Sequence, residues 1–300
     1  MPRMRAHSLV ACVLGFGVLA PAAGCERLLG IQDPVGGPVD AAGDGAPGDV
    51  PRPPTSSPLL LSEVTLTPNA AQMIEIVNVS DHAIDLSTYY LSDTDGYAAL
   101  PIIAGVDPTD FIIRFPDKAM IAGRTAITVA IDSAAAFGAY FDSANPTRVR
   151  PTYSLKDGTM NLVFADPATA GLTNAGEPVI LFQWDGVSDL VRDVDIMIVG
   201  KPAPGNQLSD KSHVPLDGPD GDMTSSRYAA DVNTIMSQGS PPGANQSTKR
   251  ILIEDGHEAH NGTGNGITGD DETSEDTSQT WDHAPYSAPT PNQPEAALLR

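Results

Sequence analysis

Three groups of acidic residues are the part of this sequence best suited to chemistry. The first group lies in residues 251–280, which hold eight Asp and Glu residues and no Lys or Arg; the second is residues 217–222, and the third is Asp93-Thr94-Asp95-Gly96. The candidate metal ligands are Asp270, Asp271, Glu272 and Asp276 in the first group, followed by Asp217, Asp220 and Asp222 in the second. Carboxylates on Gly- and Ser-rich loops suit Ca²⁺, which takes six to eight oxygen ligands. None of the groups follows the twelve-residue EF-hand pattern. The sequence leaves two interpretations open, a calcium site with residues 270–276 as the first candidate, or solvated surface charge.

Two histidines beside a glutamate suggest a second kind of chemistry. His257-Glu258-Ala259-His260 is similar to a zinc-protease helix, but that site spaces its histidines four residues apart. Here they are three apart and a Gly-rich run follows, which disfavours a helix. Residues 264–269 spell G-x-G-x-x-G, yet the acidic residues directly after them would repel a phosphate. We therefore predict a non-catalytic protein and keep a metal-dependent hydrolase that uses residues 254–276 as an alternative.

The amino-acid composition limits the classes of partner and of scaffold that this protein can have. The 300 residues carry 17 basic and 38 acidic side chains, a net charge of −21, which excludes nucleic acid as a favoured partner because a polyanion would be repelled. A 41% hydrophobic fraction is enough for a folded core. Two cysteines, Cys12 and Cys25, exclude a disulfide-rich scaffold.

The N-terminal residues have the features of an export signal. Arg3 and Arg5 precede an apolar run from residue 9 to 23, which ends in Pro-Ala-Ala-Gly-Cys. This ending resembles the lipobox of bacterial lipoproteins, which implies cleavage before Cys25 and attachment of lipid to its sulfur. We expect a lipoprotein signal peptide over residues 1–24 and a protein held in the cell envelope, at the outer membrane or cell surface rather than the inner membrane. An ordinary secretory signal is the alternative.

A linker is expected next. Of the 22 residues from 33 to 54, 18 are Pro, Gly, Ala or Asp, and such a segment buries too little apolar surface to fold. Residues 25–57 are therefore predicted to be a lipidated cysteine followed by a disordered linker.

Short β-strands dominate the remaining sequence. Apolar runs of four to eight residues alternate with turn signals such as Asp157-Gly158 and Asp185-Gly186, and a single helical turn is expected over residues 133–140. The expected strands include residues 59–64, 72–79, 89–91, 111–115, 126–131, 161–164, 178–182 and 194–199. Many short strands without alternating long helices predict an all-β, antiparallel β-sandwich with long acidic loops.

Several phrases resemble a lamin tail domain. They are Leu61-Ser62-Glu63-Val64, Ile74-Glu75-Ile76-Val77-Asn78, residues 84–93, residues 121–124, residues 172–177, Ser247-Thr248-Lys249-Arg250 and Pro289-Thr290-Pro291-Asn292. Thr88 in place of the usual glycine, and Asn292 directly after Pro291, depart from that pattern. The resemblance implies an immunoglobulin-like sandwich over residues 58–293, with residues 200–247 as a loop-rich insertion, 251–280 as an acidic loop and 294–300 as a tail.

These observations lead to one expected function and two alternatives. We expect a lipid-anchored binding or adhesion module that holds a protein or a glycan at the bacterial surface, because neither the phrases nor the composition supply catalytic groups. An architectural component of an envelope complex without a free ligand is the first alternative, and the hydrolase is the second.

Overall fold

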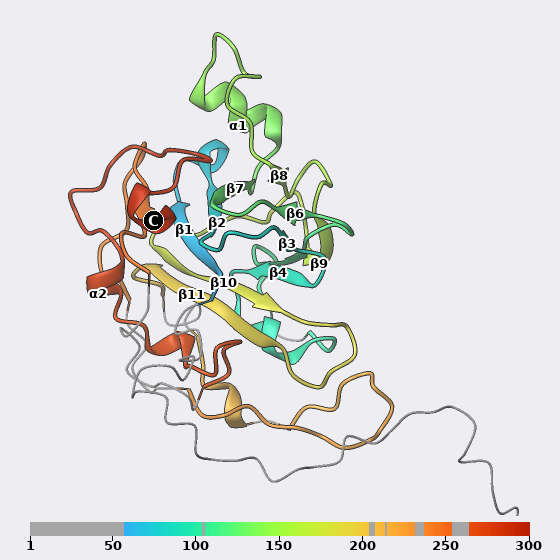
Figure 1. Cartoon of the computed structure of the whole chain (residues 1–300). Helices are drawn as coiled ribbons and strands as arrows, with labels where there is room; N and C mark the ends of the chain where they lie inside the picture. The colour runs from blue at the N-terminus through green and yellow to red at the C-terminus, as the bar shows by residue number, and fades with distance from the viewer. Residues whose placement is uncertain (1–56, 104–105, 204–207, 214, 232–236, 254–263) are drawn as a thin grey trace, which may run out of the picture. The chain divides into compact units, whose positions relative to one another are not determined.

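Two five-stranded sheets build the folded part of the chain. The computed structural model describes residues 57–103, 106–203, 208–213, 215–231, 237–253 and 264–300 (Figure 1). One sheet has the order β12 (Thr248–Lys249), β1 (Leu59–Thr65), β2 (Met73–Asn78), β7 (Thr125–Ala130) and β8 (Tyr153–Ser154). The other has the order β11 (Arg192–Gly200), β10 (Gly176–Gln183), β4 (Tyr89–Ser92), β5 (Phe111–Arg114) and β9 (Asn161–Ala165).

The strand pairs are antiparallel with one exception among the described residues, the parallel pair β7–β8. A separate two-stranded sheet joins β3 (Ile84–Asp85) to β6 (Met120–Ile121). The main core lies between the two large sheets, where Leu61 and Ile76 of the first pack in one cluster with Ile113 and Leu181 of the second. The prediction of an all-β sandwich is confirmed.

Parts of the outer faces of both sheets are covered as well, which explains why many of their strands read as apolar runs. All seven residues of β1 are buried: Leu61 faces the main core, whereas Leu60 packs with Val77 and Leu298 on the other side of the sheet. Leu298 belongs to the 3₁₀ helix η5 (Ala296–Leu299). The segment 294–300, expected to be a tail, therefore covers part of the first sheet.

The outer face of the second sheet carries a core of its own. Ile180 and Phe182 of β10 pack there with Tyr97 of the 3₁₀ helix η2 (Asp95–Ala99) and with Tyr228. Tyr228 lies in the segment predicted to be a loop-rich insertion, residues 200–247. The described part of that segment is poor in regular structure, but its apolar side chains cover the sheet.

The expected helical turn is α1 (Ala134–Phe141), which begins after Ser133; the Ser133 side chain accepts a hydrogen bond from the backbone N–H of Ala136. A second helix that the sequence pattern did not predict, α2 (Thr277–Thr280), is one turn long and begins after Asp276. The remaining short 3₁₀ helices are η1 (Asn69–Ala71), η3 (Lys211–His213) and η4 (Glu272–Ser274). Among the described residues, no helix has the length and apolar character that crossing a bilayer requires.

Candidate functional site

The first predicted calcium segment uses two of its carboxylates to begin short helices. Asp271 precedes η4 and accepts hydrogen bonds from the backbone N–H and hydroxyl of Thr273, while Asp276 precedes α2 and accepts from Ser278 and Gln279. Among the described residues, two groups of three carboxylates bring oxygens within 4.8 Å of one another, and neither contains Asp270, Asp271, Glu272 or Asp276. The structure therefore does not gather these four carboxylates into one ligand group.

A neighbouring carboxylate in this segment completes a buried ion network. The Arg250 guanidinium donates to both oxygens of Asp195 at 2.8 Å and to Glu275 at 2.6 Å, and all three side chains are buried. Its Nε also donates to the carbonyl of Leu61 at 2.8 Å, and its Cζ atom lies 4.9 Å from the ring centre of Trp281. Burial raises the pKa of Asp195 to about 7, against the opposing effect of Arg250. Since Arg250 follows β12 and Asp195 lies on β11, the network joins the edge strands of the two sheets.

A buried lysine has a similar structural role on the other face of the second sheet. Lys211 Nζ lies 2.8 Å from Asp231 Oδ1 and 3.2 Å from Asp193 Oδ2, and the Tyr97 hydroxyl donates to Asp193 at 2.8 Å. Burial alone would lower the pKa of Lys211, but the two carboxylates outweigh it and raise the pKa above its ordinary value. The charged lysine thus ties its own segment and Asp231 to β11.

The second predicted group is brought together in part. Carboxylate oxygens of Asp217 and Asp220 lie within 4.8 Å of Asp189, a residue just before β11 that the sequence did not single out. Asp222 accepts instead from the backbone N–H of Thr224 at 2.7 Å. Asp217 and Asp220 are exposed. Cys25, His257, Glu258 and His260 lie outside the described residues.

Three buried carboxylates form a group that sequence reasoning missed as a unit. Asp93 directly follows β4, Asp110 directly precedes β5, and Glu177 is the second residue of β10. Because β4 lies between β5 and β10 and runs antiparallel to both, its last residues meet the first residues of its neighbours. The carboxylate oxygens of the three residues lie within 4.8 Å of one another. Asp93 belongs to an acidic group noted in the sequence; a lone acid at the start of each neighbouring buried strand was the overlooked signal.

Hydrogen bonding and electrostatics are uneven within this group, which we call the carboxylate triad. Asp93 Oδ1 accepts from the backbone N–H of Phe111 at 2.7 Å, whereas its buried Oδ2 has no hydrogen-bond partner. Asp110 Oδ2 accepts from the backbone N–H of Asp107 at 3.1 Å. Burial raises the pKa of Asp93 well above its ordinary value, and the nearby charges of Glu177 and Asp110 add to that shift.

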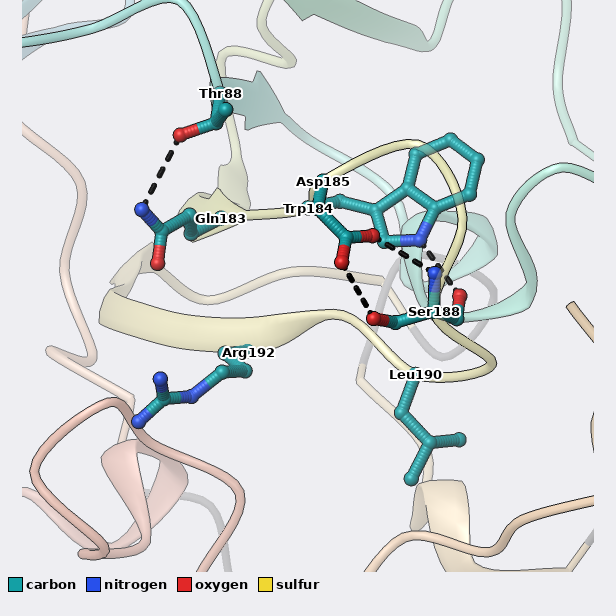
Figure 2. Close-up of a pocket in the computed structure, with 7 residues that line it drawn as sticks. All are labelled: Thr88, Gln183, Trp184, Asp185, Ser188, Leu190 and Arg192. Atoms are coloured by element: carbon teal, nitrogen blue, oxygen red, sulfur yellow. Dashed lines mark hydrogen bonds between the residues drawn. The ribbon is translucent and has the colours of Figure 1, made fainter. Parts of the chain in front are cut away.

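A surface pocket of about 340 Å³ lies at the opposite end of the same strands, beside the β10–β11 hairpin. Figure 2 shows its lining residues, which are Thr88, Gln183, Trp184, Asp185, Ser188, Leu190 and Arg192. The Trp184 indole N–H donates to the Ser188 carbonyl at 2.8 Å, and Asp185 accepts from the backbone N–H of Ser188 at 2.7 Å. The hairpin loop therefore fixes the orientation of the only tryptophan in the pocket.

The pocket wall combines this aromatic ring with polar groups. The Gln183 amide donates to Thr88 Oγ1 at 3.2 Å, and Arg192 Nη2 donates to the carbonyl of Ile267 at 2.8 Å. From the sequence alone, Asp185-Gly186 is only a turn signal. An aromatic residue and an arginine flanking a hairpin turn were the local signal for this pocket.

Fold and geometry define an all-β sandwich with a tryptophan-lined pocket at one end of a sheet and a carboxylate triad at the other. No family model matches the chain, and none of the curated proteins matches it either. Among solved structures, the chain is similar to a DUF4876 family protein from Bacteroides thetaiotaomicron VPI-5482, with 16% identity and a TM-score of 0.41. The match covers 78% of this chain and 72% of the other. At this level the likeness adds nothing to the argument from the residues.

Proposed function

We propose that this protein is a non-catalytic, lipid-anchored binding module of the bacterial cell envelope, and that its pocket beside Trp184 holds a glycan. The observation that carries the proposal is the pocket itself, in which a fixed indole ring lies among amide, guanidinium and hydroxyl groups. An aromatic body with a few placed polar groups is the usual composition of a small-ligand site.

The size of the pocket favours a glycan over a protein surface. Small-ligand pockets begin at about 300 Å³, so a volume of about 340 Å³ lies at the small end of that range. A pocket of this size suits a ligand of one or two sugar rings. A stable protein interface instead buries about 800 Å² on each partner, which a single pocket of this size does not offer.

The polar groups also suit sugar hydroxyls. A carboxamide both donates and accepts hydrogen bonds, and a guanidinium offers five N–H donors. Arg192 donates to the carbonyl of Ile267 through Nη2. The indole N–H of Trp184 is already bonded to Ser188, so the ring contributes its apolar face for stacking against C–H groups. Since the hairpin holds the ring in place, binding costs little ordering of side chains.

The anchoring part of the proposal rests on the sequence. The lipobox-like ending at Cys25 and the Pro- and Gly-rich segment after it support a lipid anchor and a spacer, with the folded module at the outer membrane or cell surface. The net charge of −21 argues against nucleic acid as the ligand.

The hydrogen bonds made by the motif residues support the resemblance to a lamin tail domain. The Asn78 side chain, at the end of the Ile-Glu-Ile-Val-Asn phrase, donates to the carbonyls of His82 at 2.7 Å and Ala122 at 3.2 Å. Asn292 of the closing phrase accepts from the backbone N–H of Thr128 at 3.1 Å and donates to the carbonyl of Arg150 at 3.1 Å. These side chains satisfy backbone groups between distant segments, a reason for such phrases to recur in one fold.

Binding of saccharides by the full chain tests the pocket. We expect saturable heat of binding for at least one member of a panel of galactose, mannose, N-acetylglucosamine and their short oligomers, together with a change in Trp184 fluorescence. Trp281 is fully buried and should not respond. Trp184→Ala should abolish the heat, while Tyr140→Ala, which removes a partly exposed aromatic side chain from α1, should leave it unchanged.

Two outcomes would count against the proposal. The absence of a binding signal with every saccharide of the panel would refute a glycan pocket. Binding that persists in Trp184→Ala would place the glycan elsewhere. Anchoring is tested separately: Cys25→Ala should release the protein from the membrane fraction, and retention there would refute the lipid anchor.

A further inference from the structure

We propose that the carboxylate triad of Asp93, Asp110 and Glu177 binds one Ca²⁺ ion. The inference is independent of the glycan pocket, because the two sites occupy opposite ends of strands β4 and β10. It goes beyond the calcium sites that the sequence suggested, because the acidic group 93–96 noted there contains Asp93 but neither Asp110 nor Glu177.

Topology brings the three ligands together from separate parts of the chain. Asp93 and Glu177 are 84 positions apart, yet they meet because the end of β4 lies beside the start of β10. Their oxygens and those of Asp110 lie within 4.8 Å of one another. Ligands of one Ca²⁺ ion, each about 2.3–2.6 Å from the metal, have separations of this order.

The charges that act on Asp93 and Asp110 are those of other carboxylates. Asp95 and Asp107 lie near enough to Asp110 to raise its pKa in addition to the effect of burial. Within the described part of the chain, no nitrogen of Lys, Arg or His lies within 4.0 Å of the carboxylates of Asp93 or Asp110. Asp195 and Asp193, equally buried, have Arg250 and Lys211 as partners.

The independent observation is the state of Asp93 itself. Its side chain is only 2% exposed and is oriented by the hydrogen bond from the backbone N–H of Phe111 to Oδ1, yet Oδ2 accepts no hydrogen bond. A buried carboxylate oxygen without a partner is costly, and most such groups in folded proteins are satisfied. A cation held between the three carboxylates would supply the partner that Oδ2 lacks.

The chemistry of the ligands selects the class of ion. Three carboxylates without a sulfur or imidazole favour a hard cation that prefers oxygen. Ca²⁺ tolerates irregular geometry and accepts carboxylates with either one or both oxygens, whereas Mg²⁺ demands near-octahedral ligands at 2.0–2.1 Å. Bound Ca²⁺ would tie the start of the 93–110 segment, which carries η2, to β5 and β10.

Calcium titration of the full chain, stripped of metal with a chelator, tests the site. We expect calorimetry to show one tight site for CaCl₂ and the melting midpoint to rise with calcium, since the ion binds the folded state. MgCl₂ at the same concentration should give a smaller rise.

Variants locate the site. Asp93→Asn and Glu177→Gln should each weaken calcium binding at least tenfold. Without calcium, Asp93→Asn should melt no lower than the unmodified chain, because the amide removes a like charge and keeps an oxygen for Phe111. The matched control is the double variant Asp217→Asn and Asp220→Asn, which removes the exposed group and should bind calcium normally.

Three results would overturn the proposal. They are no calcium binding at millimolar concentration, unchanged binding in both Asp93→Asn and Glu177→Gln, and loss of binding in the control variant. An equal response to MgCl₂ would overturn the assignment of the ion as Ca²⁺.

Discussion

Replacing Glu75 by glutamine should make the protein more stable above neutral pH. Glu75 lies on β2 directly opposite Glu63 of β1, and both side chains are buried. Ser62 Oγ donates to Glu75 Oε1 at 2.8 Å, and the backbone N–H of Gln293 donates to Oε2 at 3.1 Å. A glutamine fits the same space: its oxygen can accept from Gln293, and its amide can donate to the Ser62 hydroxyl.

The magnitude follows from the pKa. Burial, with a smaller contribution from the charge of Glu63, raises the pKa of Glu75 from 4.5 to about 7. The folded state therefore holds a proton that the unfolded state releases, so the contribution to stability is full below pH 4.5 and is lost as the pH rises through 7. A pKa shift of this size corresponds to about 3 kcal/mol of unfolding free energy, at roughly 1.4 kcal/mol for each unit of pKa.

Urea denaturation at pH 5, 6, 7 and 8 measures the effect. The difference in unfolding free energy between Glu75→Gln and the unmodified chain should grow by about 2–3 kcal/mol, in favour of the variant, when the pH is raised from 5 to 8. Glu295→Gln, the same replacement at an exposed position, is the matched control. Parallel pH dependence in the unmodified chain and in Glu75→Gln would refute the reasoning, because it would show that Glu75 does not hold a proton in the folded state.

Three further predictions concern the contacts between distant segments. Arg250→Met should lower the unfolding free energy at pH 7 by about 3–5 kcal/mol, because Asp195 and Glu275 lose their buried cation, and a loss below about 1 kcal/mol in urea denaturation would contradict this. Leu298→Ala should cost about 2–5 kcal/mol in the same assay if the C-terminal helix covers the first sheet as described, whereas a free tail would show no change. Asn292→Ala should lower the melting midpoint, because it removes side-chain bonds to two backbone groups and places alanine at a φ of 60°; an unchanged midpoint would show that the closing phrase does not hold the sheet.

The strands could be predicted well because their signal is local. The apolar runs and the turn signals between them placed most strands within a few residues, as for residues 178–182 within β10 (Gly176–Gln183). Depth of burial was harder to predict. The β2 strand keeps Glu75 and Asn78 buried beside its apolar residues, since both faces of its sheet are covered by segments that lie far away in the sequence.

The acidic residues show which contacts a local sequence pattern does not predict. A dense cluster such as 270–276 attracts attention, but hydroxyl and backbone donors beside Asp271 and Asp276 turn these carboxylates into helix caps. The carboxylate triad draws one residue from each of three strand ends. Its partners depend on which strands are neighbours, and a single sequence carries no direct signal of that order.

The sequence by itself determined that the chain is acidic, rich in short strands and equipped with an ending typical of a lipoprotein signal, because composition, periodicity and short motifs are local properties. Tertiary structure alone decided that Arg250 joins the two sheets and that three carboxylates meet beyond β4. It also decided that Leu208, Leu216 and Tyr228 pack on the outer face of one sheet and Leu298 on that of the other. Strand order and sheet packing create these contacts between residues tens to hundreds of positions apart. The chemistry of this protein, both at Trp184 and at the carboxylate triad, therefore depends on packing that no local pattern encodes.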